Sequence, residues 1–355
     1  MLGSVAGLAL LIGRLLHVAG GGGPFEGLAS ARVAVDSAHR EIVIELPPAD
    51  LPARPPGGEM AMVLFPVCVA EIPASGAIFR ARIELVDSAG DTLSQQFLHH
   101  FNLSDPGRRE LFLPIALHLM AASKETPAVA VPRFVFGLPL RRGQRLLTSA
   151  MLANTTTAAY RQVRVRLALG YEPVDEIWPL FPAYPWVMDV LFPLGHGPDG
   201  SKAFDLPPGR TERAFESSPA VPGTIVGLGG HLHDYAVGLE LRDVTSGEVV
   251  WNATLVRDRA GHMLSIPVTH LYNWHRLGIH IVPTHRYRVT AVYENPTGHL
   301  IPDGAMGAVG GLFVPDRGVE WPTVDPRDTL YQRDLAATLR TDAGGSAMML
   351  MMNMH

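Results

Sequence analysis

The stretch Gln162-Val-Arg-Val-Arg-Leu-Ala-Leu169 alternates polar and apolar side chains along most of its length. Successive side chains of a β-strand point to opposite faces, so this pattern predicts a strand with one buried face and one solvated face. Similar short runs, separated by turn residues, occupy much of the chain on either side of it. They include residues 31–35, 41–46, 77–86, 248–256, 287–293 and 308–314. The sequence therefore predicts an all-β protein.

These runs fall into two groups, which we expect to form two tandem antiparallel β-sandwiches of jelly-roll type over residues 30–172 and 223–316. Residues 173–222 between them are crowded with proline and glycine, which predicts a connecting strap with little regular structure. Residues 317–355 form a polar tail with one short helix expected near 327–339. Residues 1–29 are apolar near their start and resemble a secretory signal, or else form a disordered N-terminus, and we expect export.

Composition excludes some classes of function. The chain has 355 residues, of which 18% are charged, and its formal net charge is −5, so we expect no binding of nucleic acid. Cys68 is the single cysteine, so neither an intramolecular disulfide nor a cysteine-based zinc site can form. Because it lies in an apolar run, we expect Cys68 to be a small buried side chain.

A possible metal chelate lies in Val226-Gly-Leu-Gly-Gly-His-Leu-His-Asp-Tyr-Ala-Val-Gly-Leu-Glu-Leu241. If this run is a strand, His231 and His233 project from one face and can bind one ion. Imidazole suits copper, zinc, iron and nickel, so the pair alone does not name the metal. Two such histidines also fit a polar lining or a packed core. Asp234 either orients an imidazole or caps the turn that follows.

Two further groups of residues are candidate ligands. His99 and His100 end a strand-like run in the first half, and both can face one ion only where the strand is bulged or ends. Met306 follows a long turn and precedes the last strand expected in the second half. A methionine in that position, taken alone, is usually part of a core.

The order of these residues resembles that of the copper type II, ascorbate-dependent monooxygenases, the family of peptidylglycine α-hydroxylating and dopamine β-monooxygenases. The resemblance implies one copper in each sandwich, with the two coppers facing each other across an open cleft. His231, His233 and Met306 would hold the oxygen-binding copper, and His99 and His100 would belong to the electron-donating site. The implied reaction is hydroxylation of a C–H bond of a small molecule by O₂, with ascorbate or another reductant supplying electrons.

The chain departs from that family at several positions. The family's third histidine of the first site would fall within residues 142–154, where this chain has Met151. Methionine would favour Cu(I) and raise the reduction potential of the site. The family's anchors for a substrate carboxylate correspond to Gly229, Ala308 and Gly310, which argues against amidated-peptide chemistry. A non-catalytic copper-binding or extracellular interaction module with the same fold is therefore the alternative.

Three other patterns could indicate a metal site. A cupin also uses His-x-His, but Glu240 lies further from His233 than that motif places its glutamate. The histidines between residues 262 and 285 have irregular spacing and are expected to be structural. The end of the chain, residues 346–355, is rich in methionine and is either a soft-ligand segment for copper or a disordered tail.

Overall fold

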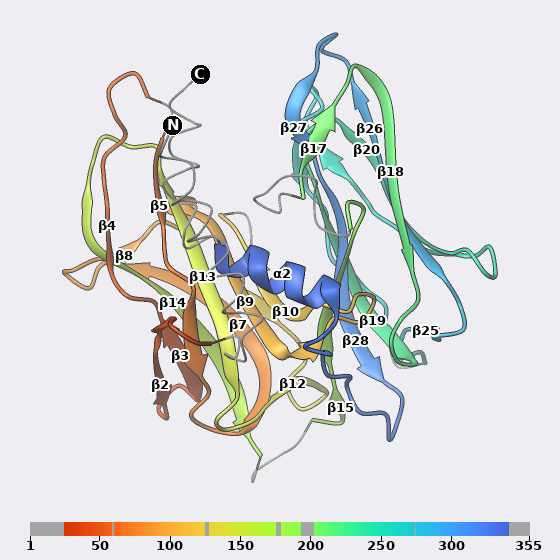
Figure 1. Cartoon of the computed structure of the whole chain (residues 1–355), viewed down its shortest axis with the longest axis horizontal. Coiled ribbons are helices and arrows are strands. Elements are labelled where there is room, and N and C mark those ends of the chain that lie inside the picture. The colour runs from red at the N-terminus through yellow and green to blue at the C-terminus, as the bar shows by residue number, and fades with distance from the viewer. Residues whose placement is uncertain are drawn as a thin grey trace, which may run out of the picture.

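The computed structural model describes residues 25–58, 60–124, 128–174, 179–192, 202–273 and 275–340. Within these ranges the chain consists mainly of strands and forms two β-sandwiches that stand side by side (Figure 1). The predicted all-β class and the tandem sandwiches are confirmed. Most of the predicted N-terminal signal, residues 1–24, and the methionine-rich end, from residue 341 onward, lie outside the described residues.

The first sandwich has two sheets. One sheet has the strand order β1 (Ala29–Ser30), β6 (Cys68–Glu71), β13 (Arg145–Asn154), β9 (Leu98–Arg109) and β10 (Ala116–Ala122), with β5 (Ala61–Leu64) added to β13. The other has the order β15 (Phe181–Pro182), β12 (Phe136–Leu140), β7 (Gly76–Val86), β14 (Tyr160–Pro173), β3 (Glu41–Glu45) and β2 (Arg32–Asp36). Short strands extend this second sheet, namely β8 (Thr92–Leu93) and β11 (Val129–Ala130) on β7 and β4 (Ala49–Leu51) on β14, and a 3-10 turn (Gln95–Phe97) precedes β9.

The second sandwich also has two sheets. One has the order β16 (Tyr184–Asp189), β28 (Gly307–Pro315), β19 (Gly223–Leu232) and β24 (Thr269–His270), with β25 (Ile279–Ile281) added to β19. The other has the order β18 (Gly209–Ser217), β26 (Tyr287–Asn295), β20 (Ala236–Asp243) and β21 (Val249–Asn252). Two small ribbons complete it, β17 (Phe204–Leu206) with β27 (Ile301–Ala305) and β22 (Val256–Arg257) with β23 (Met263–Ser265).

Strand β14 contains the alternating run that predicted the fold. It pairs with β3 on one side and β7 on the other, so it is an inner strand of its sheet. Val163, Val165 and Leu167 are each 0% exposed and belong to the core. Removing apolar side chains from water is the main force that holds such layers together. The buried face predicted for this run is confirmed.

The proline-rich stretch 173–222 differs from its prediction. Its described part contains β15, β16, β17 and β18, so regular structure is present where little was expected. Pro182 lies in β15 and Pro185 in β16, and each of these strands stands at the edge of its sheet. An edge strand tolerates proline because one of its sides makes no ladder hydrogen bonds. The second sandwich therefore includes β16, well before residue 223.

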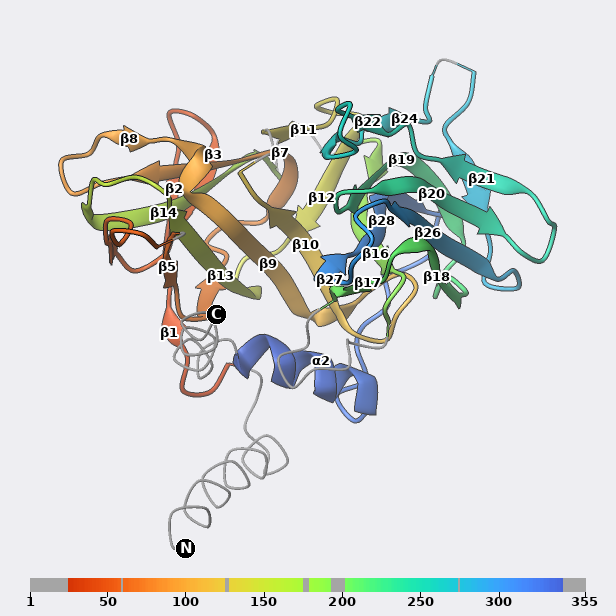
Figure 2. The same ribbon diagram turned by 90° about the horizontal axis from the view of Figure 1, so that it is seen from above.

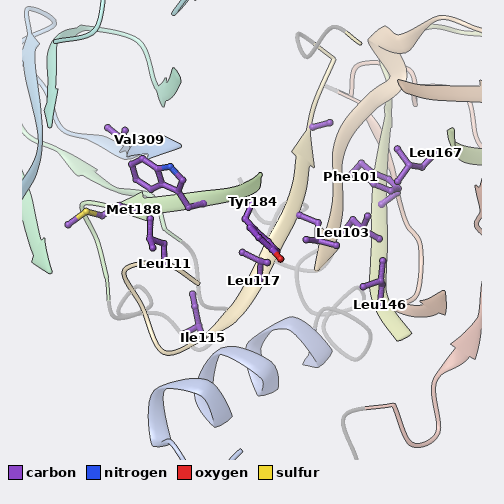
Figure 3. Close-up of a cluster of buried hydrophobic side chains, with 14 of the residues drawn as sticks. Phe101, Leu103, Leu111, Ile115, Leu117, Leu146, Leu167, Tyr184, Met188 and Val309 are labelled. Carbon is purple, nitrogen blue, oxygen red and sulfur yellow. The ribbon is translucent and has the colours of Figure 1, made fainter. Parts of the chain in front are cut away.

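One apolar core runs through both sandwiches. Figure 3 shows it passing from Phe101 of the first sandwich, past Leu117 of β10, to Tyr184, Met188 and Val309 of the second. Strand β10 of the first sandwich lies beside β16 of the second, which brings these side chains together. Because the core is continuous, the two sandwiches are packed on each other as well as linked by the chain.

Trp321 closes the junction between the sandwiches. Its ring stacks on that of Tyr184 in β16, with 4.2 Å between the ring centroids. Its indole N–H donates a hydrogen bond of 2.8 Å to the backbone carbonyl of Arg109 at the end of β9. A residue of the predicted polar tail thus binds both sandwiches at once.

The single helix expected in the tail is confirmed as α2 (Thr329–Arg340). Asp328 caps it, because its carboxylate accepts the backbone N–H of Leu330 at 2.7 Å. Tyr331 and Leu335 pack against the first sandwich, and Figure 2 shows α2 lying along one side of the molecule. No helix in the described part of the chain is long and apolar enough to cross a membrane. Cys68 is buried, as predicted.

Candidate metal centre

The His-x-His pair and Met306 meet at the adjoining ends of β19 and β28. These strands are antiparallel, and their pairing extends to Leu232 opposite Gly307. Continuing this register one residue past the last pair would place His233 opposite Met306. Opposite residues share a face of a sheet, and residues two apart along a strand share it too. The rings of His231 and His233 lie edge to face with centroids 5.3 Å apart. The three predicted ligands therefore lie on one face.

Tyr293 joins the backbones of two of these residues. Its side chain is buried, and its hydroxyl accepts the backbone N–H of His233 at 3.0 Å and that of Met306 at 3.2 Å. The same hydroxyl donates a hydrogen bond to the backbone carbonyl of Met306. Because all three groups meet one oxygen atom, His233 and Met306 are neighbours in the folded chain.

The surroundings of His233 favour its neutral form. Burial lowers the pKa of this imidazole below its ordinary value, and this outweighs Asp234 and the backbone carbonyls of Asp303 and Gly304, which act in the other direction. Metals bind the neutral imidazole, so a lowered pKa keeps His233 available as a ligand at neutral pH. Asp234 itself accepts the backbone N–H of Met263 at 2.8 Å and so fastens the adjacent loop.

The first-domain residues meet at a β-bulge. In the pairing of β9 with β13, His100 is opposite Met151 and Leu98 is opposite Leu152, so His99 is an extra residue on its strand. A bulge is the condition under which adjacent histidines can share a face. The two rings lie edge to face with centroids only 4.3 Å apart. His99, His100 and Met151 therefore lie together.

The two groups of residues lie in different sandwiches. In Figure 1, β5 and β13, beside the first group, belong to the left-hand sandwich, and β17 and β27, beside the second, belong to the right-hand one. Each group offers two imidazoles and one thioether. In the described ranges, no three His, Cys, Asp or Glu side chains come together in a way that could hold a metal ion. A methionine sulfur would therefore have to be the third metal ligand in either group.

The positions that the resemblance assigned to substrate anchors lie beside the second group. Gly229 of β19 is directly opposite Gly310 of β28, and His231 is opposite Ala308. These three small residues thus share the face of the predicted ligands. They supply neither a guanidinium, an amide nor a phenol to hold a carboxylate there.

Three other histidines of the second half pair with three different carboxylates. His262 pairs with Asp258 at 2.8 Å, His280 with Asp316 at 3.1 Å, and His285 with Asp243 at 2.6 Å. Each pair has its own carboxylate on a separate loop or strand end. This arrangement agrees with the structural role expected of these histidines.

Asp189 also belongs to the face of the second group. It lies in β16 opposite Ala308, which in turn is opposite His231, so the three form one row across the sheet. One carboxylate oxygen accepts the backbone N–H of Leu191 at 2.8 Å, and the other is buried without a hydrogen-bond partner in the described part of the chain. Burial raises the pKa of Asp189, against the opposing effects of Lys202 and that backbone N–H.

The raised pKa of Asp189 predicts how the stability of the fold changes with pH. The folded chain binds this proton more tightly than the unfolded chain, so the stabilisation is complete below the ordinary pKa of 3.8 and is lost as pH rises through the folded value. An asparagine at this position would have no such proton to lose. In urea unfolding from pH 3 to pH 8, the unfolding free energy of Asp189→Asn relative to the wild type should therefore rise with pH.

Asp243→Asn is the matched control for that measurement. Asp243 is also buried, but hydrogen bonds from His285, Ser246 and Thr245 outweigh the effect of burial and lower its pKa. Its stabilisation is present at neutral pH and is lost on acidification, so the stability difference should change with pH in the opposite direction. Equal pH dependence of the two variants would contradict the assignment of a raised pKa to Asp189.

Two residues of the site were missed in the sequence. Tyr293 stands in the alternating run 287–293, where an aromatic residue looks like ordinary core. Asp189 lies in the proline-rich stretch that was expected to be irregular. Nothing in the local sequence marks either residue, because Asp189 reaches the site through the pairing of β16 with β28 and Tyr293 through hydrogen bonds of its hydroxyl from the opposite sheet.

The sequence matches no protein-family model and no curated protein. Among solved structures, it is similar to PNGase F, a glycosylasparaginase from Flavobacterium meningosepticum, with 10% identity over 77% of this chain and 96% of that chain and a TM-score of 0.34. It is similar to PNGF-II, with 10% identity over 83% and 63% of the two chains and a TM-score of 0.30. A protein of Sulfolobus Turreted Icosahedral Virus gives 9% identity over 77% and 59% and a TM-score of 0.20. Likenesses this distant carry no argument about function.

Proposed function

We propose that this chain is a copper-dependent oxidoreductase that hydroxylates a C–H bond of a small molecule, using O₂ and an external reductant such as ascorbate. The observation that carries the proposal is the shared hydroxyl of Tyr293, which joins the backbones of His233 and Met306. With His231 on the same face, these residues would hold one copper. His99, His100 and Met151 would hold a second.

The chemistry of the donors fits copper better than a hard cation. Imidazole nitrogen suits copper in both oxidation states, and thioether sulfur favours Cu(I), whereas calcium and magnesium prefer oxygen ligands. The lowered pKa of His233 keeps its nitrogen free of a proton at neutral pH. Bound copper would supply one-electron exchange with O₂. The residues of the chain would orient the metal and the substrate.

The residues beside His231 limit the ways in which a substrate could be held there. Gly229, Gly310 and Ala308 adjoin the predicted ligands, and none of these three positions carries a charged side chain that could anchor a carboxylate. We therefore propose a substrate that is not held through a carboxylate at these positions. The cupin alternative receives less support, because the carboxylate of Glu240 is engaged by Arg242 at 2.8 Å on the other sheet of the sandwich.

A second candidate is a copper-binding module without catalytic activity. Met151 opposite His100 is the observation that favours it. A thioether in place of a third imidazole stabilises Cu(I), so the first-domain copper would be a weaker electron donor. Such a protein would bind copper and pass on few electrons.

Copper titration and oxygen uptake test the two candidates. The full chain, freed of metal, is titrated with Cu(I) without oxygen and then supplied with ascorbate and air. We expect two coppers per chain and ascorbate-dependent consumption of O₂ if the chain is an oxidoreductase. One or two coppers without O₂ consumption would support the module. Failure to bind any copper would contradict both.

A further inference from the structure

Tyr293 reaches the candidate centre from the opposite sheet of the second sandwich. It belongs to β26, and its side chain is 0% exposed. The two sheets approach closely here, because a Cβ on Gly307 of β28 would lie 2.6 Å from the Cβ of Ala291 on β26. Glycine at this position thus allows the phenol of Tyr293 to cross the core and end between β19 and β28.

The hydroxyl of Tyr293 has its hydrogen-bonding capacity fully used. A phenol offers one donor and two acceptor positions. The donor serves the carbonyl of Met306, and the acceptor positions take the N–H groups of His233 and Met306. A phenol keeps its proton at neutral pH, so the hydroxyl can donate to this carbonyl.

The hydrogen bonds of Tyr293 lie just beyond the last paired residues of β19 and β28. The pairing of β19 with β28 stops at Leu232 and Gly307, so the next residues, His233 and Met306, lie beyond the ladder. Two of the three hydrogen bonds of Tyr293 go to Met306 and one goes to His233. The hydroxyl therefore holds the backbone of Met306 at both its N–H and its carbonyl, and that of His233 at its N–H alone.

We infer that Tyr293 is a positioning residue, which fixes the thioether of Met306 beside His233 and so sets the preference of this centre for Cu(I). The inference rests on the proposed function, since it assumes that copper binds here. Loss of the hydroxyl should weaken Cu(I) binding by about 10- to 100-fold, the usual effect of removing a group that holds a ligand in place. Cu(II) binding, which depends mainly on the imidazoles, should change less.

The test uses the full chain with the first-domain imidazoles removed by His99→Ala and His100→Ala, so that the first-domain group no longer contributes to the Cu(I) affinity. Cu(I) affinity is obtained by competition with a chromophoric chelator, and circular dichroism checks the fold. Tyr293→Phe should weaken Cu(I) binding, whereas the matched control Tyr287→Phe should behave like the parent. Tyr287 lies on the same strand and is also buried, and its hydroxyl accepts the N–H of Val282, away from the centre.

A second pair of variants separates positioning from a general effect on folding. In a chain that already carries Met306→Ala, the added change Tyr293→Phe should cause a clearly smaller loss of Cu(I) affinity, because only the hydrogen bond of the hydroxyl to His233 can still affect a ligand. An equal loss with and without Met306 would overturn the inference. So would equal behaviour of Tyr293→Phe and Tyr287→Phe. A parent chain that binds no Cu(I) would instead contradict the proposed function itself.

Hydrogen exchange on the unaltered, copper-free chain provides a test that needs no variant. Tyr293 binds the amide hydrogens of His233 and Met306, so both should exchange slowly although they lie outside the β ladder. Asp234, which is exposed and next in sequence, serves as the reference. Exchange of the amides of residues 233 and 306 as fast as that of Asp234 would overturn the inference.

Discussion

Replacement of His233 by alanine is expected to weaken Cu(I) binding at the second-domain group by more than the roughly 100-fold that loss of a supporting group can cause. The change removes one of two nitrogen donors and leaves His231 and Met306 as a two-ligand site. His233 is also the histidine whose lowered pKa keeps it free of a proton. Competition with a Cu(I) chelator measures the effect directly.

His270→Ala is the control for this prediction. His270 lies on β24 of the same sheet, opposite Gly227, and thus on the face of the predicted ligands but outside their group. Its ring contacts that of Tyr272, with 5.6 Å between centroids. The control should bind Cu(I) as the wild type does. If His233→Ala bound Cu(I) as tightly as His270→Ala, the second-domain group would not be the copper site.

The fold could be predicted largely from local patterns. The alternation over residues 162–169 depends only on the two-residue period of a strand, and β14 forms there with its apolar side buried. The short helix expected near residues 327–339 forms as α2 (Thr329–Arg340). The strands β15 and β16 were missed because proline argues against a strand unless the strand lies at an edge. Whether a strand lies at an edge is decided by its neighbours in space.

The site shows the same division between local and long-range information. His231 and His233 were recognised because both stand on one short run. That His99 and His100 can share a face depends on a bulge, which arises from the register between β9 and β13. The meeting of Met306 with His233 depends on the register between β19 and β28 and on Tyr293 from the other sheet. The sequence pattern of one strand does not determine the register in which that strand pairs with another.

Replacement of Glu110, a buried charged residue, is expected to lower the stability of the fold strongly. Glu110 is 0% exposed and lies between β9 and β10, at the junction of the two sandwiches. One carboxylate oxygen accepts the backbone N–H of His118 at 2.9 Å, and the other accepts those of Leu111 at 3.3 Å and Val187 at 3.2 Å. His118 belongs to the first sandwich and Val187 to the second, so one side chain binds both.

Glu110→Ala should lower the free energy of unfolding by about 3–5 kcal/mol, because three backbone N–H groups, one buried and two partly buried, would lose their acceptor at once. Glu110→Gln should cost less, since its amide keeps the size of the side chain and one accepting oxygen but turns an NH₂ group toward N–H donors. Urea unfolding measures both changes. Glu71→Ala, at an exposed position of β6, is the control and should stay within about 0.5 kcal/mol of the wild type. If Glu110→Ala cost no more than Glu71→Ala, the buried carboxylate would not hold the sandwiches together, and the continuous apolar core would account for their packing alone.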